Sequence, residues 1–334
     1  MNELLPAYMA IVAGLVGLVW GADRFVIGAA SAAKNFGISP MVIGLTVVSI
    51  GTSAPEIIVS INAALEGSGA LAVGNALGSN LANIGLVLGI TALIAPLPAQ
   101  RHLIFQEGPV LLFVTALAGY CLYDQVLGRT ESLLMLAFIP LLLWVTVKYK
   151  VQHPNAEELA EAEDIVATSS AVATMWFMVG LLVMLASSKI LVWGAITTAA
   201  EMGISELVIG LTVVAIGTSL PELAASVTSA LRGHHDIAIG NIFGSNLFNF
   251  LAVMPIAGAI APLHLDSAVF YRDFLSVTAL TLLLIGTIVF FYFKGKGANN
   301  KASNATKSVY LSRKFGALML LLYGLYFVLL LPSS

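Results

Sequence analysis

Residues 44–56 read GLTVVSIGTSAPE and residues 210–222 read GLTVVAIGTSLPE, so the chain contains one segment twice, 166 positions apart. The match extends without a gap over 37–83 in the first copy and 203–249 in the second. A repeat of this length does not arise by chance, and we conclude that the chain is built from two related halves.

Each copy carries one glutamate, Glu56 or Glu222, in a segment that is otherwise apolar. An ionisable side chain costs free energy in such a place and is read as functional by default. Of the 334 residues, 59% are hydrophobic and only 10% are charged, whereas an ordinary soluble domain has about 25% charged residues. Apolar runs long enough to cross a bilayer recur along the chain, which predicts a polytopic membrane protein.

The apolar runs predict an all-α membrane protein with ten transmembrane helices, because backbone groups in lipid must bond internally and the runs are too long for barrel strands. The expected spans are 4–31, 40–65, 71–95, 104–123, 129–148, 171–198, 205–231, 237–261, 271–293 and 312–331. On this interpretation residues 1–150 form a first five-helix repeat, 151–170 a cytoplasmic acidic linker, and 171–334 a second five-helix repeat.

The Lys and Arg residues of the connecting loops predict the orientation in the membrane. The loops after even-numbered spans hold only Arg129 and Arg272. The loops after odd-numbered spans hold eleven basic residues, namely Lys34, Arg101, Lys148, Lys150, Arg232, Lys294, Lys296, Lys301, Lys307, Arg313 and Lys314. We therefore expect cytoplasmic odd-numbered loops and extracytoplasmic termini in a multi-pass protein of the cell inner (plasma) membrane. Because five spans is an odd number, the second repeat enters the membrane inverted, as in secondary transporters that bind substrate near the midplane.

Polar residues in each copy share one helix face, because residues three and four apart lie on the same side of a helix. The first stripe consists of Ser49, Thr52, Ser53 and Glu56, and its counterparts are Ala215, Thr218, Ser219 and Glu222. Pro55 and Pro221 lie within these stripes, and each removes the hydrogen bond to the carbonyl four residues earlier, at Gly51 or Gly217. We expect the freed carbonyls near Thr52 and Thr218 to face a cavity.

Spans 71–95 and 237–261 carry a second stripe of polar residues at intervals of four. It consists of Asn75, Ser79 and Asn83 in the first copy and of Asn241, Ser245 and Asn249 in the second. Carboxylate, hydroxyl, amide and carbonyl oxygens suit hard cations such as calcium, which takes about six to eight oxygen ligands. Neither stripe contains Cys or His, which argues against selectivity for transition metals.

The two glutamates together carry two negative charges, which one divalent ion cancels. Without a cation the carboxylates would repel each other, and at least one would take up a proton. We therefore expect cations or protons to occupy the site in every long-lived state. One cation must then replace another before the site opens to the other side of the membrane.

These residues resemble the alpha-repeats of the cation/calcium exchanger superfamily, in particular its bacterial sodium/calcium exchanger branch, which is similar to the potassium-dependent animal exchangers. The resemblance is carried by GTSAPE at 51–56, GTSLPE at 217–222, GNALGSNLANIG at 74–85 and GNIFGSNLFNFL at 240–251. It implies ten helices and alternating access, in which the first and sixth spans slide past the rest.

The resemblance also implies a role for each matching residue. Glu56 and Glu222 would be the central calcium ligands, together with the carbonyls of Thr52 and Thr218. Ser53, Ser79 and the carbonyl of Ser49 would form one sodium site; Ser219, Ser245 and the carbonyl of Ala215 would form its inverted partner; Asn83 and Asn249 would complete the middle of the cluster. Some relatives have an acidic residue where Asn249 stands, which puts the number of coupled sodium ions and any potassium requirement in doubt.

Calcium/sodium antiport is the leading interpretation, and calcium/proton antiport, in which the two glutamates would trade calcium for protons, is the alternative. A cation channel is less favoured, because no ring of charges around an open pore is evident. No H-E-x-x-H, Walker lysine motif or G-x-S-x-G is found at the end of a span, so we do not expect an enzyme. We expect calcium and sodium ions and the lipid bilayer as partners, with potassium possible as a further transported ion, and no cofactor, nucleic acid or obligate protein partner.

Two charged residues of the expected sliding spans occupy equivalent positions of the repeat, namely Asp23 and Lys189. One interpretation is that such residues pair or extend to the interface near helix ends. The other is that this pair biases the equilibrium between inward-open and outward-open states.

Overall fold

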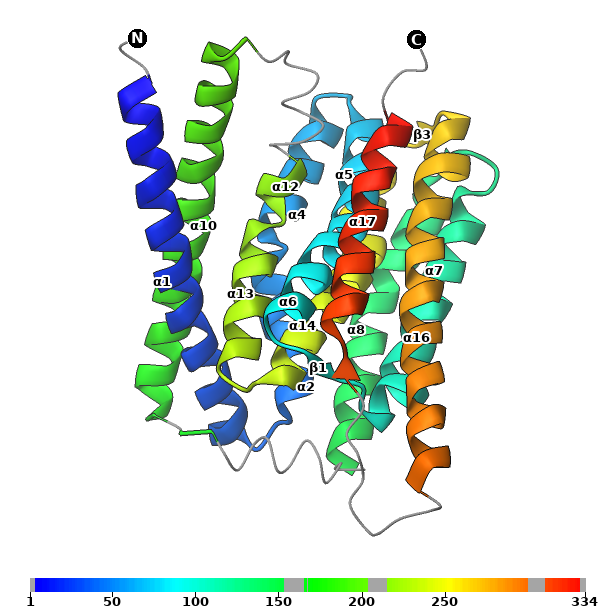
Figure 1. Cartoon of the computed structure of the whole chain (residues 1–334). Helices are drawn as coiled ribbons and strands as arrows, with labels where there is room; N and C mark the ends of the chain where they lie inside the picture. Colours follow the sequence, from blue (N-terminus) through cyan, green and yellow to red (C-terminus); the bar gives the residue numbers. More distant parts are fainter. Residues whose placement is uncertain (1–3, 153–164, 167, 204–214, 300–309, 331–334) are drawn as a thin grey trace. The chain divides into compact units, whose positions relative to one another are not determined.

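The structure is a computed structural model that describes residues 4–152, 165–166, 168–203, 215–299 and 310–330, and the described residues are helical almost throughout (Figure 1). Most of the expected linker 151–170 lies outside the described residues, as does the first part of the expected span 205–231.

Where the structure describes the expected spans, helices cover them in both halves of the chain, and several of these helices are interrupted by π-helical turns, labelled η. The elements of the first half are α1 (Leu4–Phe36), α2 (Pro40–Ile43), η1 (Gly44–Val48), α3 (Ser49–Thr52), α4 (Ala54–Leu65), α5 (Gly69–Ala82), η2 (Asn83–Val87), α6 (Leu88–Ile94), β1 (Leu97–Pro98), η3 (Leu103–Glu107), α7 (Gly108–Leu122), β2 (Val126–Leu127) and α8 (Arg129–Gln152). Those of the second half are α10 (Ser170–Glu201), α12 (Ala215–Thr218), α13 (Leu220–Leu231), α14 (His235–Phe248), η5 (Asn249–Val253), α15 (Met254–Ile260), β3 (Leu263–His264), η6 (Val269–Phe274), α16 (Leu275–Asn299), β4 (Tyr310–Leu311) and α17 (Arg313–Leu330).

The repeat recurs in the backbone. The elements α3, α4, α5, η2 and α6 have counterparts with the same bounds 166 residues later, which are α12, α13, α14, η5 and α15. π-helical turns are rare and are often found at functional sites. Their recurrence at Asn83 and Asn249 therefore indicates a functional role for these two positions. The two halves therefore share local structure as well as sequence.

The second expected span is broken at Ser53, in agreement with the position of Pro55. The helices on either side of the break are bent by 46° relative to each other. Ser53 has φ −81° and ψ 8°, which are not helical values, and its counterpart Ser219 has φ −89° and ψ 3°. Each proline lies two residues after the break. Because proline lacks the backbone N–H that a helix uses as a donor, the helix is interrupted at the same place in both repeats.

Eight of the described helices are long and apolar enough to cross a membrane, or nine if the bent pair that covers 40–65 is counted as one span. The chain is thus a multi-pass membrane protein. The remaining expected span, 205–231, is described only from Ala215 onward. The described residues therefore account for at most nine of the ten expected spans and do not test the tenth.

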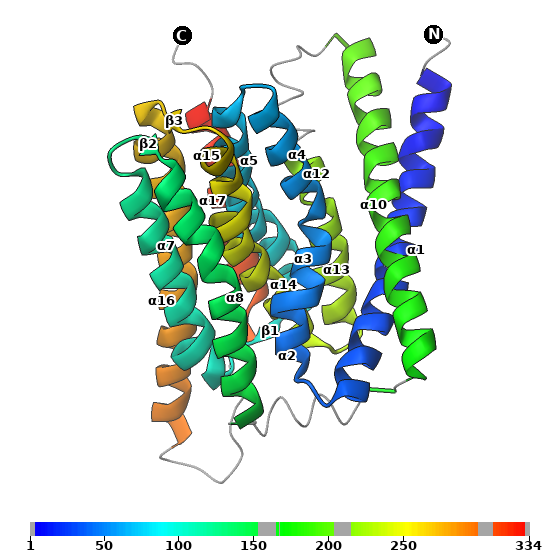
Figure 2. The ribbon, with the colours of Figure 1, turned by 180° about the vertical axis from the view of Figure 1, so that it is seen from behind.

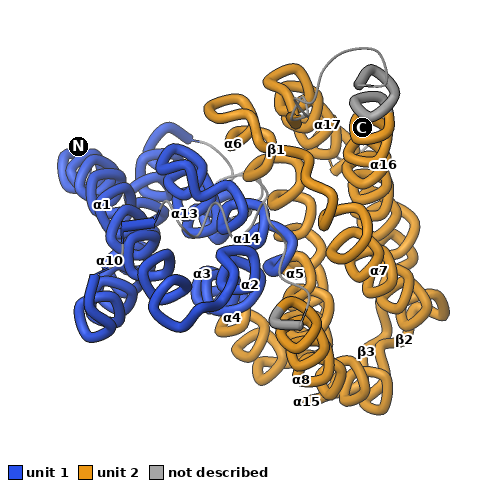
Figure 3. The backbone as a smooth tube through the Cα atoms, turned by 90° about the horizontal axis from the view of Figure 1, so that it is seen from below, with its two compact units in different colours: residues 1–56, 158–245 blue, residues 57–157, 246–334 orange. Residues whose placement is uncertain are grey.

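The chain divides into two compact units, which Figure 3 shows in separate colours. The first unit comprises Met1–Glu56 and Glu158–Ser245, and the second comprises Ile57–Glu157 and Asn246–Ser334. Each unit takes residues from both halves of the chain, so the compact units do not coincide with the two sequence repeats.

In the first unit, α1 and α10 run side by side in both side views (Figures 1 and 2). A Cβ atom added to Gly21 would lie 2.7 Å from the backbone nitrogen of Met184 and 2.9 Å from the carbonyl oxygen of Gly180. The reverse holds for Gly180, where a Cβ atom would lie 2.7 Å from the carbonyl oxygen of Gly21. The two backbones therefore touch through glycines, as small residues allow in membrane helices.

The second unit is joined by two short antiparallel strand pairs. Strand β1 pairs with β4, with Leu97 opposite Leu311, and β2 pairs with β3, with Leu127 opposite Leu263. Strands β1 and β3 each follow the third expected span of a repeat, and β4 and β2 each precede the last span of a repeat. Each pair therefore joins one repeat to the other in the same way. The sequence did not predict these strands, because two residues are too few for an alternating pattern.

The glycine contact between α1 and α10 predicts that Gly21→Ala is destabilising. The added methyl group would overlap backbone atoms, and overpacking of this kind costs about 1–3 kcal/mol. We expect a lower melting temperature for the purified variant in detergent. The matched control is Gly324→Ala in α17, where no described atom lies within 4 Å of the added Cβ. Equal melting temperatures for Gly21→Ala and the wild type would contradict the close backbone contact.

Candidate cation-binding site

The two repeated glutamates lie at equivalent places in the fold. Glu56 is in the first turn of α4 and Glu222 is in the first turn of α13, each just after a helix break. Both side chains are buried, with 1% of their surface exposed. The positive end of a helix dipole favours a carboxylate in the first turn, which offsets part of the cost of burial.

Among the described residues, only one of the two carboxylate oxygens of Glu222 accepts a hydrogen bond. Its Oε1 atom accepts a hydrogen bond from the Ser53 hydroxyl at 3.0 Å, and the Ser53 and Ser245 hydroxyls lie 3.2 Å apart. Its Oε2 atom has no hydrogen-bond partner among the described residues. The first unit therefore contains a buried carboxylate oxygen next to two hydroxyl oxygens, and the sequence predicted an ion-binding role for all three residues.

Ser49 and Thr52 are fully buried on α3 in the same unit. The Ser49 hydroxyl donates to the carbonyl oxygen of Leu45 at 2.8 Å, within its own helix. A hydroxyl that donates its proton keeps the lone pairs of its oxygen, so the hydroxyl oxygen and the backbone carbonyl of Ser49 can both serve as cation ligands.

The second break is formed by Thr218 and Ser219, and Ala215 is the first residue of the preceding helix α12. The hydroxyl of Ser219 has no hydrogen-bond partner among the described residues. The carbonyl of Gly217, which Pro221 was expected to leave facing a cavity, instead accepts a hydrogen bond from the Ser188 hydroxyl of α10 at 3.1 Å. That expectation was wrong for Gly217, because it did not include the side chains of the neighbouring helix.

The remaining predicted residues, Ser79, Asn83 and Asn249, belong to the second unit and are buried there. Asn83 and Asn249 are the first residues of the π-helical turns η2 and η5. Asn249 donates through Nδ2 to Oδ1 of Asn80 at 3.1 Å. Among the described residues the Oδ1 atoms of Asn83 and Asn249 have no hydrogen-bond partner, so each repeat offers a buried amide oxygen as an acceptor.

The predicted residues thus present acceptor oxygens that the described residues leave unsatisfied, on Glu222, Asn83 and Asn249. A buried polar atom without a partner costs about 1–3 kcal/mol, and more if it is charged. In the first unit a hard cation can pair with the open oxygen of Glu222, and in the second unit the two amide oxygens are ligands of the same kind. Among the described residues no group of three or more His, Cys, Asp or Glu side chains is placed to hold a metal, so any cation here would rely on hydroxyl, amide and carbonyl oxygens beside the glutamates.

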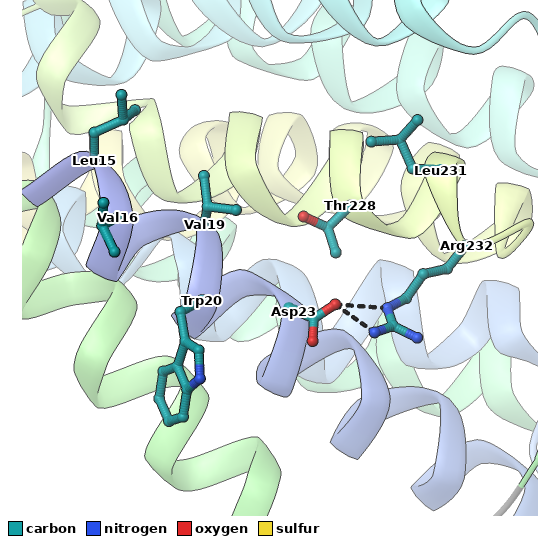
Figure 4. Close-up of a pocket in the computed structure, with 8 residues that line it drawn as sticks. All are labelled: Leu15, Val16, Val19, Trp20, Asp23, Thr228, Leu231 and Arg232. Atoms are coloured by element: carbon teal, nitrogen blue, oxygen red, sulfur yellow. Dashed lines mark hydrogen bonds and ion pairs between the residues drawn. The ribbon is translucent and has the colours of Figure 1, made fainter.

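Asp23 has a partner that the sequence did not predict. Its carboxylate accepts hydrogen bonds from Nε of Arg232 at 2.8 Å and from Nη2 of the same residue. The pair lines a pocket of about 750 Å³ between α1 and α13 (Figure 4). Sequence reasoning compared Asp23 with Lys189 and assigned Arg232 to a cytoplasmic loop, whereas the arginine side chain reaches back to α1.

A second ionic cluster lies in the second unit. Oε1 of Glu107 is 2.7 Å from Nζ of Lys150, and Oε2 is 3.0 Å from Nδ1 of His102. All three side chains are buried. The sequence contains no signal for this cluster, because Lys150 is far from His102 and Glu107 in sequence and was read as a loop residue.

Comparison with known proteins identifies the family. Residues 6–148 and 172–331 match the family model described as sodium/calcium exchanger protein. The chain is 48% identical to CaxA of Alkalimonas amylolytica, over 84% of this chain and 89% of the relative. It is 39% identical to inner membrane protein YrbG of Escherichia coli, over 86% of this chain and 88% of the relative.

A solved structure, described as the sodium/calcium exchanger from Methanococcus jannaschii, superimposes with a TM-score of 0.78 at 30% identity and covers 96% of this chain and 97% of its own. The family resemblance stated from the motifs is therefore confirmed. The chain belongs to the sodium/calcium exchanger family of membrane transporters.

Proposed function

We propose that the protein is a secondary active antiporter that exchanges calcium for sodium by alternating access. The observation that carries this proposal is the buried carboxylate of Glu222, with Ser53 bound to one oxygen and no described partner on the other. A cation would neutralise this carboxylate and pair with its unbonded oxygen. The surrounding oxygen atoms are of the kind that bind calcium and sodium. The similarity to a sodium/calcium exchanger of known structure supports the choice of ions.

In this proposal Glu56 and Glu222 bind calcium, together with the backbone carbonyls of Thr52 and Thr218. Sodium takes two further sites. One is formed by Ser53, Ser79 and the carbonyl of Ser49, and the other by Ser219, Ser245 and the carbonyl of Ala215. Asn83 and Asn249 contribute amide oxygens. Because residue 249 is an amide, the cluster carries two formal negative charges, which one calcium ion or two sodium ions neutralise.

The proposed architecture is ten spans in two inverted five-helix repeats, residues 1–150 and 171–334, joined by the linker 151–170. The backbone equivalence of the two halves at a spacing of 166 residues supports it, and inversion follows from the odd number of spans. The charge distribution of the loops supports extracytoplasmic termini. The inner-membrane relative supports a location in the plasma membrane.

The exchange of calcium for sodium follows from the free-energy cost of leaving the two buried carboxylates without a cation. Two carboxylates in a dry interior cannot both stay charged without a counter-ion, so the transition between the two access states is favourable only when cations are bound. Calcium on one side of the membrane must then be replaced by sodium on the other. No separate energy source is required beyond the sodium gradient.

Calcium/proton exchange is the alternative, because protons also neutralise glutamates. The hydroxyls of Ser53 and Ser245 near Glu222 favour sodium, since a proton needs no such additional oxygen ligands. A channel is less favoured, because binding groups this deeply buried suit an occluded ion better than a continuous pore.

The first prediction of this proposal concerns the two glutamates. Glu56→Gln and Glu222→Gln each remove one of the two charges that balance calcium, so each is expected to abolish calcium-45 uptake into proteoliposomes driven by an outward sodium gradient. Imposing sodium, proton and potassium gradients separately on the wild type identifies the coupling ion.

The matched control for these variants is Glu66→Gln, because Glu66 is an exposed carboxylate that follows the same helix as Glu56. It is expected to transport at the wild-type rate. Wild-type exchange by either Glu56→Gln or Glu222→Gln would overturn the assignment of the site, and uptake driven by protons but not by sodium would favour the alternative.

The second prediction concerns Ser53, whose hydroxyl holds Oε1 of Glu222. Ser53→Ala removes this hydrogen bond and a proposed sodium ligand, so the dissociation constants of calcium and sodium should each rise about five- to tenfold, as expected for a loss of about 1–1.4 kcal/mol. The increase in melting temperature that each ion produces reports its binding to the folded protein. Ser276→Ala is the control, because among the described residues the Ser276 hydroxyl bonds the Arg272 carbonyl, four residues earlier in the chain. An undiminished shift in Ser53→Ala would show that Ser53 does not serve the site.

A further inference from the structure

Asn241 lies beside the proposed site but is not among its ligands. It is a fully buried residue of α14 in the first unit. Its Nδ2 atom donates to the hydroxyl of Ser226 at 2.9 Å and to the carbonyl oxygen of Glu222 at 3.3 Å. Its Oδ1 atom accepts from the hydroxyl of Thr52 at 3.1 Å. One amide therefore joins the two broken helices that carry Thr52 and Glu222.

The orientation of this amide follows from its partners. The backbone carbonyl of Glu222 can only accept hydrogen bonds, so the amino group of Asn241 must face it. The amide oxygen then faces the Thr52 hydroxyl, which must donate its proton to make a hydrogen bond. The arrangement thus assigns a direction to the Thr52 proton.

The Thr52 hydroxyl has a second acceptor within reach, the carbonyl oxygen of Ser49 at 3.3 Å. A hydroxyl carries one proton and can make only one full-strength donated hydrogen bond. The shorter contact is the one to Asn241, at 3.1 Å. While Asn241 accepts this proton, the Ser49 carbonyl does not receive it.

The Ser49 carbonyl already accepts one hydrogen bond, from the backbone N–H of Ser53 at 3.0 Å. A carbonyl oxygen has two lone pairs, so one remains. If the Thr52 proton turned toward Ser49, it would take the remaining lone pair. The acceptor choice of Thr52 therefore decides whether the Ser49 carbonyl has capacity left for a cation.

We propose that Asn241 is a positioning residue that draws the Thr52 hydroxyl proton away from the Ser49 carbonyl and so keeps this carbonyl available to sodium. The inference rests on the proposed function, in which the Ser49 carbonyl is a sodium ligand. Asn241 touches no ion itself. Its effect passes through Thr52, and it is specific to the ion that uses the Ser49 carbonyl.

The test is a double-mutant cycle on sodium-driven calcium efflux from proteoliposomes. Asn241→Leu removes the acceptor, so the Thr52 proton turns to Ser49 and the KM for sodium is expected to rise about five- to tenfold, the effect of about 1–1.4 kcal/mol. Thr52→Val removes the proton and serves as the second reference background of the cycle, because the residue also carries a proposed calcium ligand. In the double variant Asn241→Leu/Thr52→Val no proton competes for Ser49, so the KM for sodium should equal that of Thr52→Val alone.

A purely structural role for Asn241 predicts a different pattern, because lost packing would reduce the amount of folded protein and would do so in both backgrounds. An equal rise in the KM for sodium with and without Thr52→Val, or no rise in Asn241→Leu, would overturn the inference. If Asn241→Leu does not fold, Asn241→Ala takes its place in the cycle with the same expectation.

Ser226→Ala is the matched control, because it removes a partner of the Asn241 amino group and leaves the acceptor for Thr52 in place. Its KM for sodium should equal that of the wild type, and a rise as large as in Asn241→Leu would overturn the inference. The same assay on the wild type distinguishes a failure of the proposed function from a failure of the inference about Asn241. If its efflux is not driven by sodium, the proposed function and the inference both fail. If it is driven by sodium and the cycle shows no coupling, only the inference fails.

Discussion

The structure depends on one constraint, the burial of two carboxylates in segments that are otherwise apolar. Glu56 and Glu222 are each only 1% exposed. Charged groups in such a place need partners, and the chain supplies hydroxyls, helix N-termini and broken backbone in the same segments. The helix breaks at Ser53 and Ser219, and the Ser53 and Ser245 hydroxyls beside Glu222, are consistent with the need to give these charges polar partners.

The sequence predicted much of this arrangement, because its signals are local. Pro55 and Pro221 indicated where helical hydrogen bonding is interrupted, and the helices break at Ser53 and Ser219, two residues before the prolines. The apolar surroundings of Glu56 and Glu222 predicted buried acids. The identity of the repeats predicted that each element of one copy would recur in the other, and α3 to α6 recur with the same bounds.

The remainder could not be predicted, because it depends on contacts between helices. No pattern distinguishes the π-helical turns at Asn83 and Asn249 from ordinary helix. Arg232 was read as a loop residue, yet its long side chain reaches Asp23 on α1. One signal was available but unused. Ser226 stands four residues after Glu222, on the same helix face, and there it meets Asn241.

The central claim is that calcium and the two sodium ions compete for the same two negative charges, those of the buried Glu56 and Glu222. Equilibrium dialysis of the purified protein against calcium-45, at increasing sodium concentration, tests it most directly. The account predicts a single class of calcium site from which sodium displaces calcium competitively. Calcium binding that persists unchanged at saturating sodium would contradict it, because the ions would then occupy independent sites and could not exchange.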